Sequence, residues 1–96
     1  MPWAPLLSEP EIVEGLVALP DWRHEGDALV RTIVCPSFRE AIAVVNRVAD
    51  AAEAANHHPD ILVHGWNKVR LSLTNHSAGG LTEADFAMAK KFDGLD

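Results

Sequence analysis

Two adjacent histidines, His57 and His58, stand at the end of a predicted helix and are followed directly by Pro59. Proline pushes the residue before it toward extended geometry, so the helix must end near the two histidines and can aim both imidazoles at one point. Glu53 lies four residues before His57 on the same helix face, and the free carbonyls of a helix C-terminus favour a protonated imidazole. This pattern indicates general acid–base chemistry near neutral pH.

A third histidine, His76, lies in a polar, glycine-bearing loop over residues 75–80. Loops that follow strands often carry sites, although a single loop histidine can equally be a solvated surface residue. Zinc binding is the rival interpretation of the three histidines. The adjacent pair lacks the spacing that puts two imidazoles on one helix face, and the chain has no HExxH motif or cysteine pair. We therefore predict a site without a metal.

These residues need a helix and strands to position them. Apolar residues at three- and four-residue spacing predict an amphipathic helix over residues 38 to about 56, started by a capping box of Ser37 and Glu40. The stripe that we expect to be buried consists of Phe38, Ala41, Ile42, Val45, Val48, Ala49, Ala52 and Ala55. Val44 and Ala51 lie off this stripe, where they could meet a second chain.

Two more helices and four strands complete the expected order. Ser8 and Glu11 form a capping box for a short helix that ends at Pro20, and Thr82 and Asp85 begin the last helix. Strands are expected over residues 21–25, 28–34, 61–66 and 69–74. Hairpins and a sheet with one wet face predict the class α+β, with a four-stranded antiparallel sheet, three helices packed on one face and the order αββαββα.

Length and composition limit the classes of function. Ninety-six residues with 48% hydrophobic content predict one domain with a modest core, over residues 8–96 after an N-terminal arm at 1–7, and the small core favours a homo-oligomer. A formal charge of -6 argues against a nucleic-acid partner. The chain has no long apolar run and no signal-peptide pattern at its start, so we expect no membrane contact and a cytoplasmic location. The single cysteine, Cys35, is expected to be structural.

The same residues resemble the signature of the pterin-4a-carbinolamine dehydratases, in which a helix-borne Glu and a His-His-Pro-acid run precede an Asn-Lys-Val strand and a Thr-rich turn with His. The matching residues here are Glu53, His57, His58, Pro59, Asp60, Asn67, Lys68, Val69, Leu73, Thr74, Asn75 and His76. The match continues through Gly80, Leu81, Thr82 and Asp85 and back to Trp22, Gly26 and Phe38. It covers all but the first few residues.

The resemblance implies dehydration of 4a-hydroxytetrahydropterin to quinonoid dihydropterin, a step that recycles the cofactor of aromatic amino acid hydroxylases and needs no metal or cofactor. It also implies the αββαββα fold and dimers or tetramers. The catalytic residues would be His57, His58 and His76. The residues around the pterin would be Pro59, Asn75, Ser77 and Ala78, supported by Glu53, Asp60, Asp85 and Trp22.

The sequence departs from the family pattern between Asp60 and Asn67, where the segment appears one residue longer than usual. A bulge at Gly65 would absorb the extra residue, whereas a shifted register would turn the apolar side of the strand outward. Two other functions compete with the dehydratase. One is a non-catalytic interaction module that binds a transcription factor's dimerisation helix, and the other is a small metal-dependent hydrolase. Retention of all three histidines favours the dehydratase.

Overall fold

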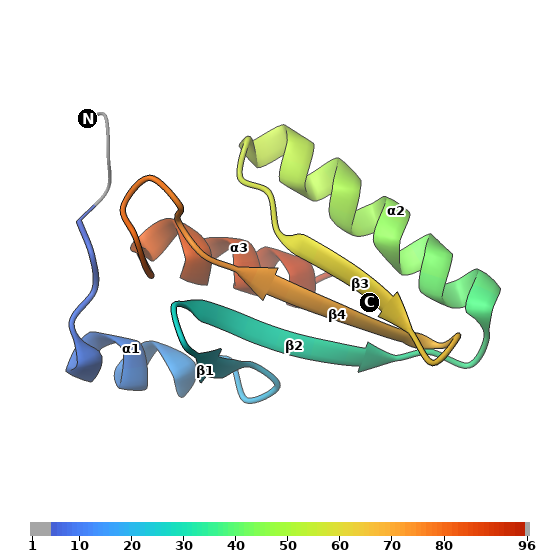
Figure 1. Cartoon of the computed structure of the whole chain (residues 1–96), viewed down its shortest axis with the longest axis horizontal. Coiled ribbons are helices and arrows are strands. Elements are labelled where there is room, and N and C mark those ends of the chain that lie inside the picture. The colour runs from blue at the N-terminus through green and yellow to red at the C-terminus, as the bar shows by residue number, and fades with distance from the viewer. Residues whose placement is uncertain (1–4, 96) are drawn as a thin grey trace.

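The computed structural model describes residues 5–95 and shows three helices and four strands (Figure 1). The elements are α1 (Glu9–Leu16), β1 (Arg23–Glu25), β2 (Ala28–Val34), α2 (Phe38–Ala55), β3 (Asp60–His64), β4 (Lys68–Leu73) and α3 (Glu83–Asp93). The α+β class and the order αββαββα are confirmed. Residues 1–4, which make up most of the expected N-terminal arm, lie outside the described residues.

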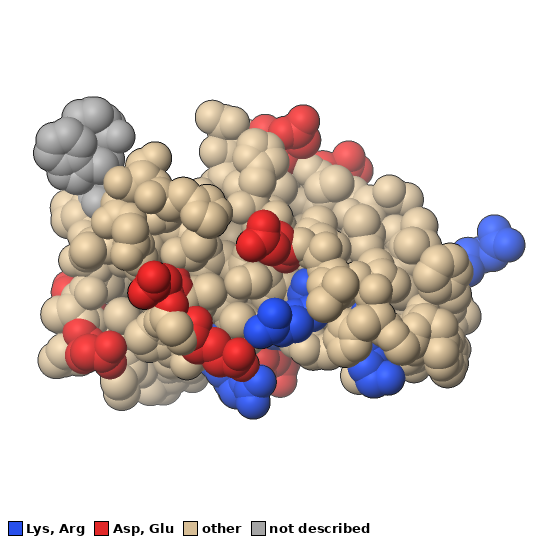
Figure 2. Space-filling view, in the orientation of Figure 1, with Lys and Arg blue, Asp and Glu red and all other residues tan. Residues whose placement is uncertain are grey.

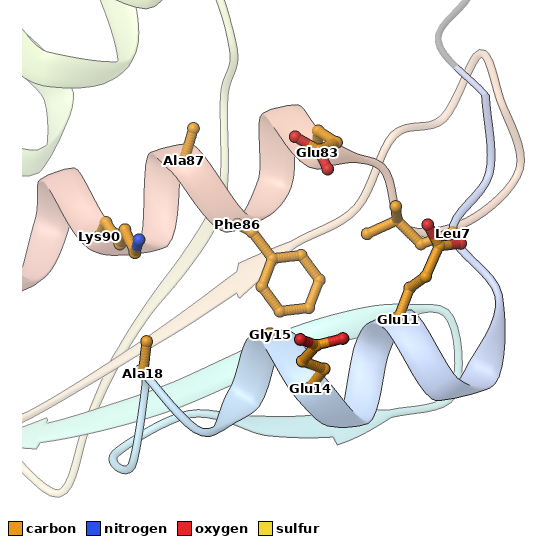
Figure 3. Close-up of a pocket in the computed structure, with 9 residues that line it drawn as sticks. All are labelled: Leu7, Glu11, Glu14, Gly15, Ala18, Glu83, Phe86, Ala87 and Lys90. Carbon is orange, nitrogen blue, oxygen red and sulfur yellow. The ribbon is translucent and has the colours of Figure 1, made fainter.

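The strands form one antiparallel sheet in the order β1-β2-β4-β3. Strand β4 lies in the centre, and its alternate residues Val69, Leu71 and Leu73 are completely buried. Helix α2 packs on β3 and β4, α3 packs on β2, and α1 faces α3 on the same side of the sheet (Figures 1 and 3). The alternation in sequence therefore places the core between one face of the sheet and the three helices. Among the described residues, no helix is long and apolar enough to cross a membrane.

The buried stripe of α2 differs from the expected one. The residues that face the core are Ala41, Val44, Val48 and Ala52, while the side chains of Phe38 and Ile42 are 55% and 38% exposed. Val44 belongs to the core, so the expectation that it meets a second chain is wrong. Ala51 is half-buried and packs against the core, and a contact with a second chain stays a prediction for it. Two neighbouring series of apolar residues share three- and four-residue spacing on this helix, and spacing alone does not tell which of them faces the sheet.

The hairpin between β3 and β4 has a turn at residues 65–67, with no bulge inside β3. Gly65 and Trp66 adopt left-handed φ values of 55° and 61°, and β3 ends before them at His64. The expected bulge at Gly65 and the strand reaching to residue 66 are therefore wrong. Ile61 and Val63 still point toward the core and are half-buried, so the register keeps the apolar side of β3 inward.

Trp22 fills the core at the C-terminal end of α3. Its ring stacks on Phe92 with centroids 6.5 Å apart, and its Nε1–H donates to Asp93 Oδ1 at 2.8 Å. Arg31 also pairs with Asp93. A buried indole keeps its polar edge satisfied in this way, so Trp22 acts as a core residue here. Cys35 is buried as well, as expected for a structural cysteine.

Candidate active site

The C-terminus of α2 aims the two adjacent histidines apart. The helix ends at Ala55, and Asn56 takes a left-handed conformation with φ 50° and ψ 43°. The N–H of His57 donates to the carbonyl of Ala52 at 3.1 Å, which closes the helix end. Asparagine is one of the few residues with a side chain that tolerates this conformation, which is common just past helix ends. The left-handed residue turns the chain, so His57 points toward α3 while His58 lies over the last turn of α2.

His57 bonds to a buried carboxylate. Its Nε2 lies 2.7 Å from Asp85 Oδ1, and the two side chains are 18% and 0% exposed. The other oxygen, Oδ2, accepts from the N–H of Thr82 at 2.9 Å and from its Oγ1 at 3.3 Å. These bonds compensate the cost of removing a carboxylate from water. When the carboxylate of Asp85 is ionised it only accepts hydrogen bonds, so Nε2 of His57 would donate to it and Nδ1 would be the ring nitrogen left for proton exchange.

His58 bonds to an exposed carboxylate. Its Nε2 lies 2.6 Å from Glu53 Oε2, and the two side chains are 54% and 77% exposed. The expected partner of Glu53 was His57, four residues along the same helix face. That expectation is wrong because the helix ends before His57. The left-handed Asn56 turns the chain, so that His58 and not His57 lies beside Glu53.

A cavity of about 350 Å³ opens between the end of α2 and the loop after β4. It is lined by Asn56, His57, His58, Thr74, Asn75, His76 and Ser77. The loop is held by Asn75, whose Oδ1 accepts from the N–H of Ala78 at 2.9 Å and whose N–H donates to the carbonyl of Gly80 at 3.0 Å. The three predicted histidines therefore face one small cavity from two chain segments far apart in sequence. Its volume is in the range of small-ligand sites.

The other predicted site residues lie at different distances from this cavity. Glu53 and Asp85 reach it through the histidines that they bond, and Pro59 and Ala78 are chain neighbours of lining residues. Asp60 begins β3 and is exposed. The structure does not bring Trp22 to the cavity, because its partner Asp93 stands eight residues after Asp85 in α3, about 12 Å along the helix axis.

Three residues at the site are not among the site residues predicted from the sequence. Asn56 and Thr74 line the cavity, and Thr82 holds the carboxylate of Asp85. An asparagine just before the two histidines is a signal for a left-handed helix end and could have identified Asn56. The role of Thr82 was hidden because a Thr with an acid three residues later is already explained as a helix cap.

No group of three His, Cys, Asp or Glu side chains in residues 5–95 is arranged to hold a metal ion. Both histidine partners at the site are carboxylates that bond the ring nitrogens directly. The arrangement offers imidazoles for proton transfer and carboxylates that orient them. It is suited to acid–base chemistry on a small polar ligand.

Comparisons with known proteins agree with one another on the family. Residues 5–95 match the family model described as pterin 4 alpha carbinolamine dehydratase. Relatives whose names place them among the pterin-4-alpha-carbinolamine dehydratases include one from Thermomicrobium roseum, 54% identical over 88% of this chain and 90% of its own. Another, from Chloroflexus aurantiacus, is 55% identical over 93% of this chain and 95% of its own.

Two solved structures share the fold. The crystal structure of a transcriptional coactivator/pterin dehydratase from Brucella melitensis has a TM-score of 0.87 and 33% identity, and the match covers 94% of this chain and 97% of that one. A pterin dehydratase-like protein described as a RuBisCO assembly factor in the alpha-carboxysome has a TM-score of 0.65 and 27% identity. That match covers 78% of this chain and 88% of the other.

Proposed function

This chain belongs to the pterin-4-alpha-carbinolamine dehydratase family, and on that premise we propose that it dehydrates 4a-hydroxytetrahydropterin to quinonoid dihydropterin by histidine acid–base catalysis. The observation that carries the proposal is the single cavity lined by His57, His58 and His76. In this role the protein would recycle the pterin cofactor of an aromatic amino acid hydroxylase.

The reaction needs one group that gives a proton and one that takes a proton. The C4a–O bond breaks and the hydroxyl leaves as water after protonation, while the N5–H bond breaks and its electron pair forms the C4a=N5 double bond. Three imidazoles around one cavity supply both groups without a metal. His57 suits the removal of the N5 proton, because the carboxylate of Asp85 stabilises the imidazolium that results. His58 and His76 then supply the proton for the hydroxyl.

The direct test is an assay with enzymatically generated 4a-hydroxytetrahydropterin, whose ultraviolet absorbance decay is followed with and without the protein. We expect His57→Ala and His76→Ala each to slow dehydration by about 10-fold or more. His76 is exposed, so its replacement should change the free energy of unfolding by no more than about 0.5 kcal/mol. The double variant should lose less than the product of the single losses, because the two groups act on one transition state.

His64→Ala is the matched control, because His64 is an exposed histidine on β3 that does not line the cavity. Thermal melts of each variant show whether it is folded. Wild-type rates in well-folded His57 and His76 variants would remove both residues from the mechanism. Loss of activity on extensive chelation, with recovery on adding zinc, would contradict a metal-independent reaction.

The exposed apolar side of α2 supports a separate proposal, the homo-oligomer that the small core predicts. Phe38 and Ile42 line a groove of about 680 Å³ at the start of this helix, together with Arg39 and Ala43. We propose that this surface holds a second copy of the chain and that the protein is a homo-oligomer, since a small domain gains stability by covering such a surface. Light scattering at micromolar concentration should show an oligomer that Phe38→Glu dissociates. A wild-type monomer across the whole concentration range would contradict this proposal.

A further inference from the structure

Helices α1 and α3 face each other across a second cavity, of about 430 Å³ (Figure 3). No described residue lines both this cavity and the histidine cavity. We call it the α1–α3 groove and define it by Glu11, Glu14, Gly15, Glu83 and Phe86, which are among the residues that line it. The proposed dehydratase mechanism makes no use of it.

The floor of the α1–α3 groove is the apolar ring of Phe86. The ring lies against α1 at Gly15, where the helix has no side chain. A Cβ built on Gly15 would come within 2.5 Å of Phe86 Cε1, so any side chain at this position would displace the ring. Figure 3 shows the ring projecting from α3 toward α1 directly over Gly15. Phe86 is only half-buried, and the neighbouring Ala18 and Ala87 are small and exposed. An aromatic surface therefore stays accessible between the two helices.

The rim of the α1–α3 groove is acidic. Glu11 and Glu14 on α1 and Glu83 on α3 are exposed, and Lys90 is the cation among the residues that line the groove. Hydrogen bonds from the backbone N–H and the hydroxyl of Ser8 lower the pKa of Glu11, so its carboxylate stays charged. In residues 5–95 neither Glu14 nor Glu83 has an ion-pair partner. Acidic side chains also gather toward the α1 and β1 end of the face seen in Figure 2.

We propose that the α1–α3 groove docks a segment of a partner protein that carries an apolar side chain flanked by lysine or arginine. The apolar side chain packs on Phe86 over Gly15, and the flanking cations lie against the three glutamates. A cation beside an aromatic ring is attracted to its face as well. Complementary charge of this kind sets the orientation of the segment and speeds its association. The three glutamates would repel the phosphate groups of a nucleic acid or of a membrane surface.

A second copy of this chain is a poorer occupant. In a second copy, the segment with apolar side chains beside a cation would be the start of α2, which carries Phe38 and Ile42 next to Arg39. Such a contact joins two different surfaces, so each copy would still offer a free groove and a free helix to the next. Unless the rotation between copies closes a ring, that arrangement leads to open chains of molecules instead of the closed oligomer proposed above.

The test uses a fluorescein-labelled amphipathic peptide of leucine and lysine, with a peptide of leucine and glutamate as its control, and follows binding to the full chain by fluorescence polarisation. We expect Glu14→Lys to weaken binding of the lysine peptide by about 10-fold or more, because attraction becomes repulsion at the rim. Ala87→Gln keeps the charge, narrows the groove and should weaken binding too. Asp50→Lys makes the same change of charge on an exposed position of α2, outside the groove, and should leave binding close to wild type.

Three results would overturn the proposal. The first is that the lysine peptide does not bind, or binds no better than the glutamate peptide. The second is that Glu14→Lys and Asp50→Lys weaken binding equally, which would show that the peptide is attracted to the net charge of -6 and not to the groove. The third is that Glu14→Lys changes the oligomeric state in the absence of peptide, which would show that the groove holds a second copy of the chain. The rate of dehydration is read on the same variants, so failure of this proposal and failure of the proposed function are separate outcomes.

Discussion

Two neighbouring histidines make the same kind of bond in very different surroundings. His57 lies 2.7 Å from the completely buried Asp85, and His58 lies 2.6 Å from Glu53, which is 77% exposed. Asp85 is held in turn by Thr82, whereas Glu53 projects from the last turn of α2. The distances are nearly equal, so geometry alone would rank the two pairs as equivalent.

Burial separates the two pairs. Water and salt screen an exposed pair, which contributes between 0 and about 1 kcal/mol. Without His57, Oδ1 of the buried Asp85 would lack its hydrogen-bond partner, which costs about 1–3 kcal/mol. The imidazole of His57 is therefore fixed in one orientation, while that of His58 can leave Glu53 at little cost. In the proposed mechanism, adjacent positions in the chain would thus provide one rigid and one adjustable group for proton transfer.

The largest effect should come from removing the negative charge of Asp85, and the same change at Glu53 is its comparison. We expect Asp85→Asn to lower kcat/KM by about 100-fold, because the amide no longer stabilises an imidazolium or fixes the proton on Nε2. Glu53→Gln should lower it by about 3-fold or less, as expected for a screened pair. Steady-state kinetics over a range of pH checks both variants, with thermal melts to show that each is folded. Equal losses would show that burial does not distinguish the pairs.

A smaller effect is expected at Thr82, which contacts the imidazole of His57 only through Asp85. Thr82→Val removes the hydroxyl that donates to Asp85 Oδ2 and leaves the backbone N–H in place. The loss of one buried hydrogen bond costs about 1 kcal/mol, which lowers Tm by about 4–8 °C in a domain of this size. The value of kcat should fall by about 5-fold with KM unchanged, since His57 is less well oriented.

Thr82→Ser keeps a hydroxyl at the same position and should restore both kcat and Tm. A purely structural role for Thr82 predicts a different result, in which Tm falls in Thr82→Val while kcat stays at the wild-type value. The two measurements together therefore separate support of the fold from support of His57.

The smallest effect is expected at the exposed counterpart of this helix cap. At the start of α1, Ser8 donates its backbone N–H to Glu11 Oε1 at 2.8 Å and its hydroxyl accepts from the N–H of Glu11. The bond from the backbone N–H of Ser8 to the carboxylate, and after it a side-chain hydrogen bond from Ser8, lower the pKa of Glu11 below its ordinary value of 4.5. A carboxyl with a lowered pKa in the folded state stabilises the fold above its ordinary pKa, and the contribution disappears as pH falls through the lowered value.

Glu11→Gln should therefore lower Tm slightly at pH 7, and the melts of wild type and variant should converge as pH falls below 4.5. Calorimetric melts at several pH values measure this. A difference in Tm that grows as the solution becomes more acidic would contradict the assignment.

Local patterns in the sequence predict most of this fold. Alternation in Val69, Leu71 and Leu73 identified the central strand, and the caps at Ser8 and Thr82 marked two helix starts correctly. These signals are complete within a few residues, so no knowledge of the rest of the chain is needed.

The sequence was less informative where the outcome depends on contacts between distant segments. Helix α2 has two apolar series, and only packing on the sheet decides that Val44 is buried and Phe38 is exposed. The partner of His57 comes from α3, 28 residues along the chain, so no local spacing indicates it. The clustering of the three histidines was expected, but the pairing of His57 and His58 with their carboxylates required the left-handed turn at Asn56.

The carboxylate of Asp85 is shared between the first turn of α3 and the ring of His57, and this sharing links catalysis to helix fraying. Helix ends open locally at a free energy well below that of global unfolding. Each such opening releases His57 while the sheet and the other helices stay intact. The upper temperature limit of activity should therefore be set by one helical turn and lie below the temperature at which the domain melts. Amide hydrogen exchange at Thr82, whose N–H donates to Asp85, reports how often that turn opens.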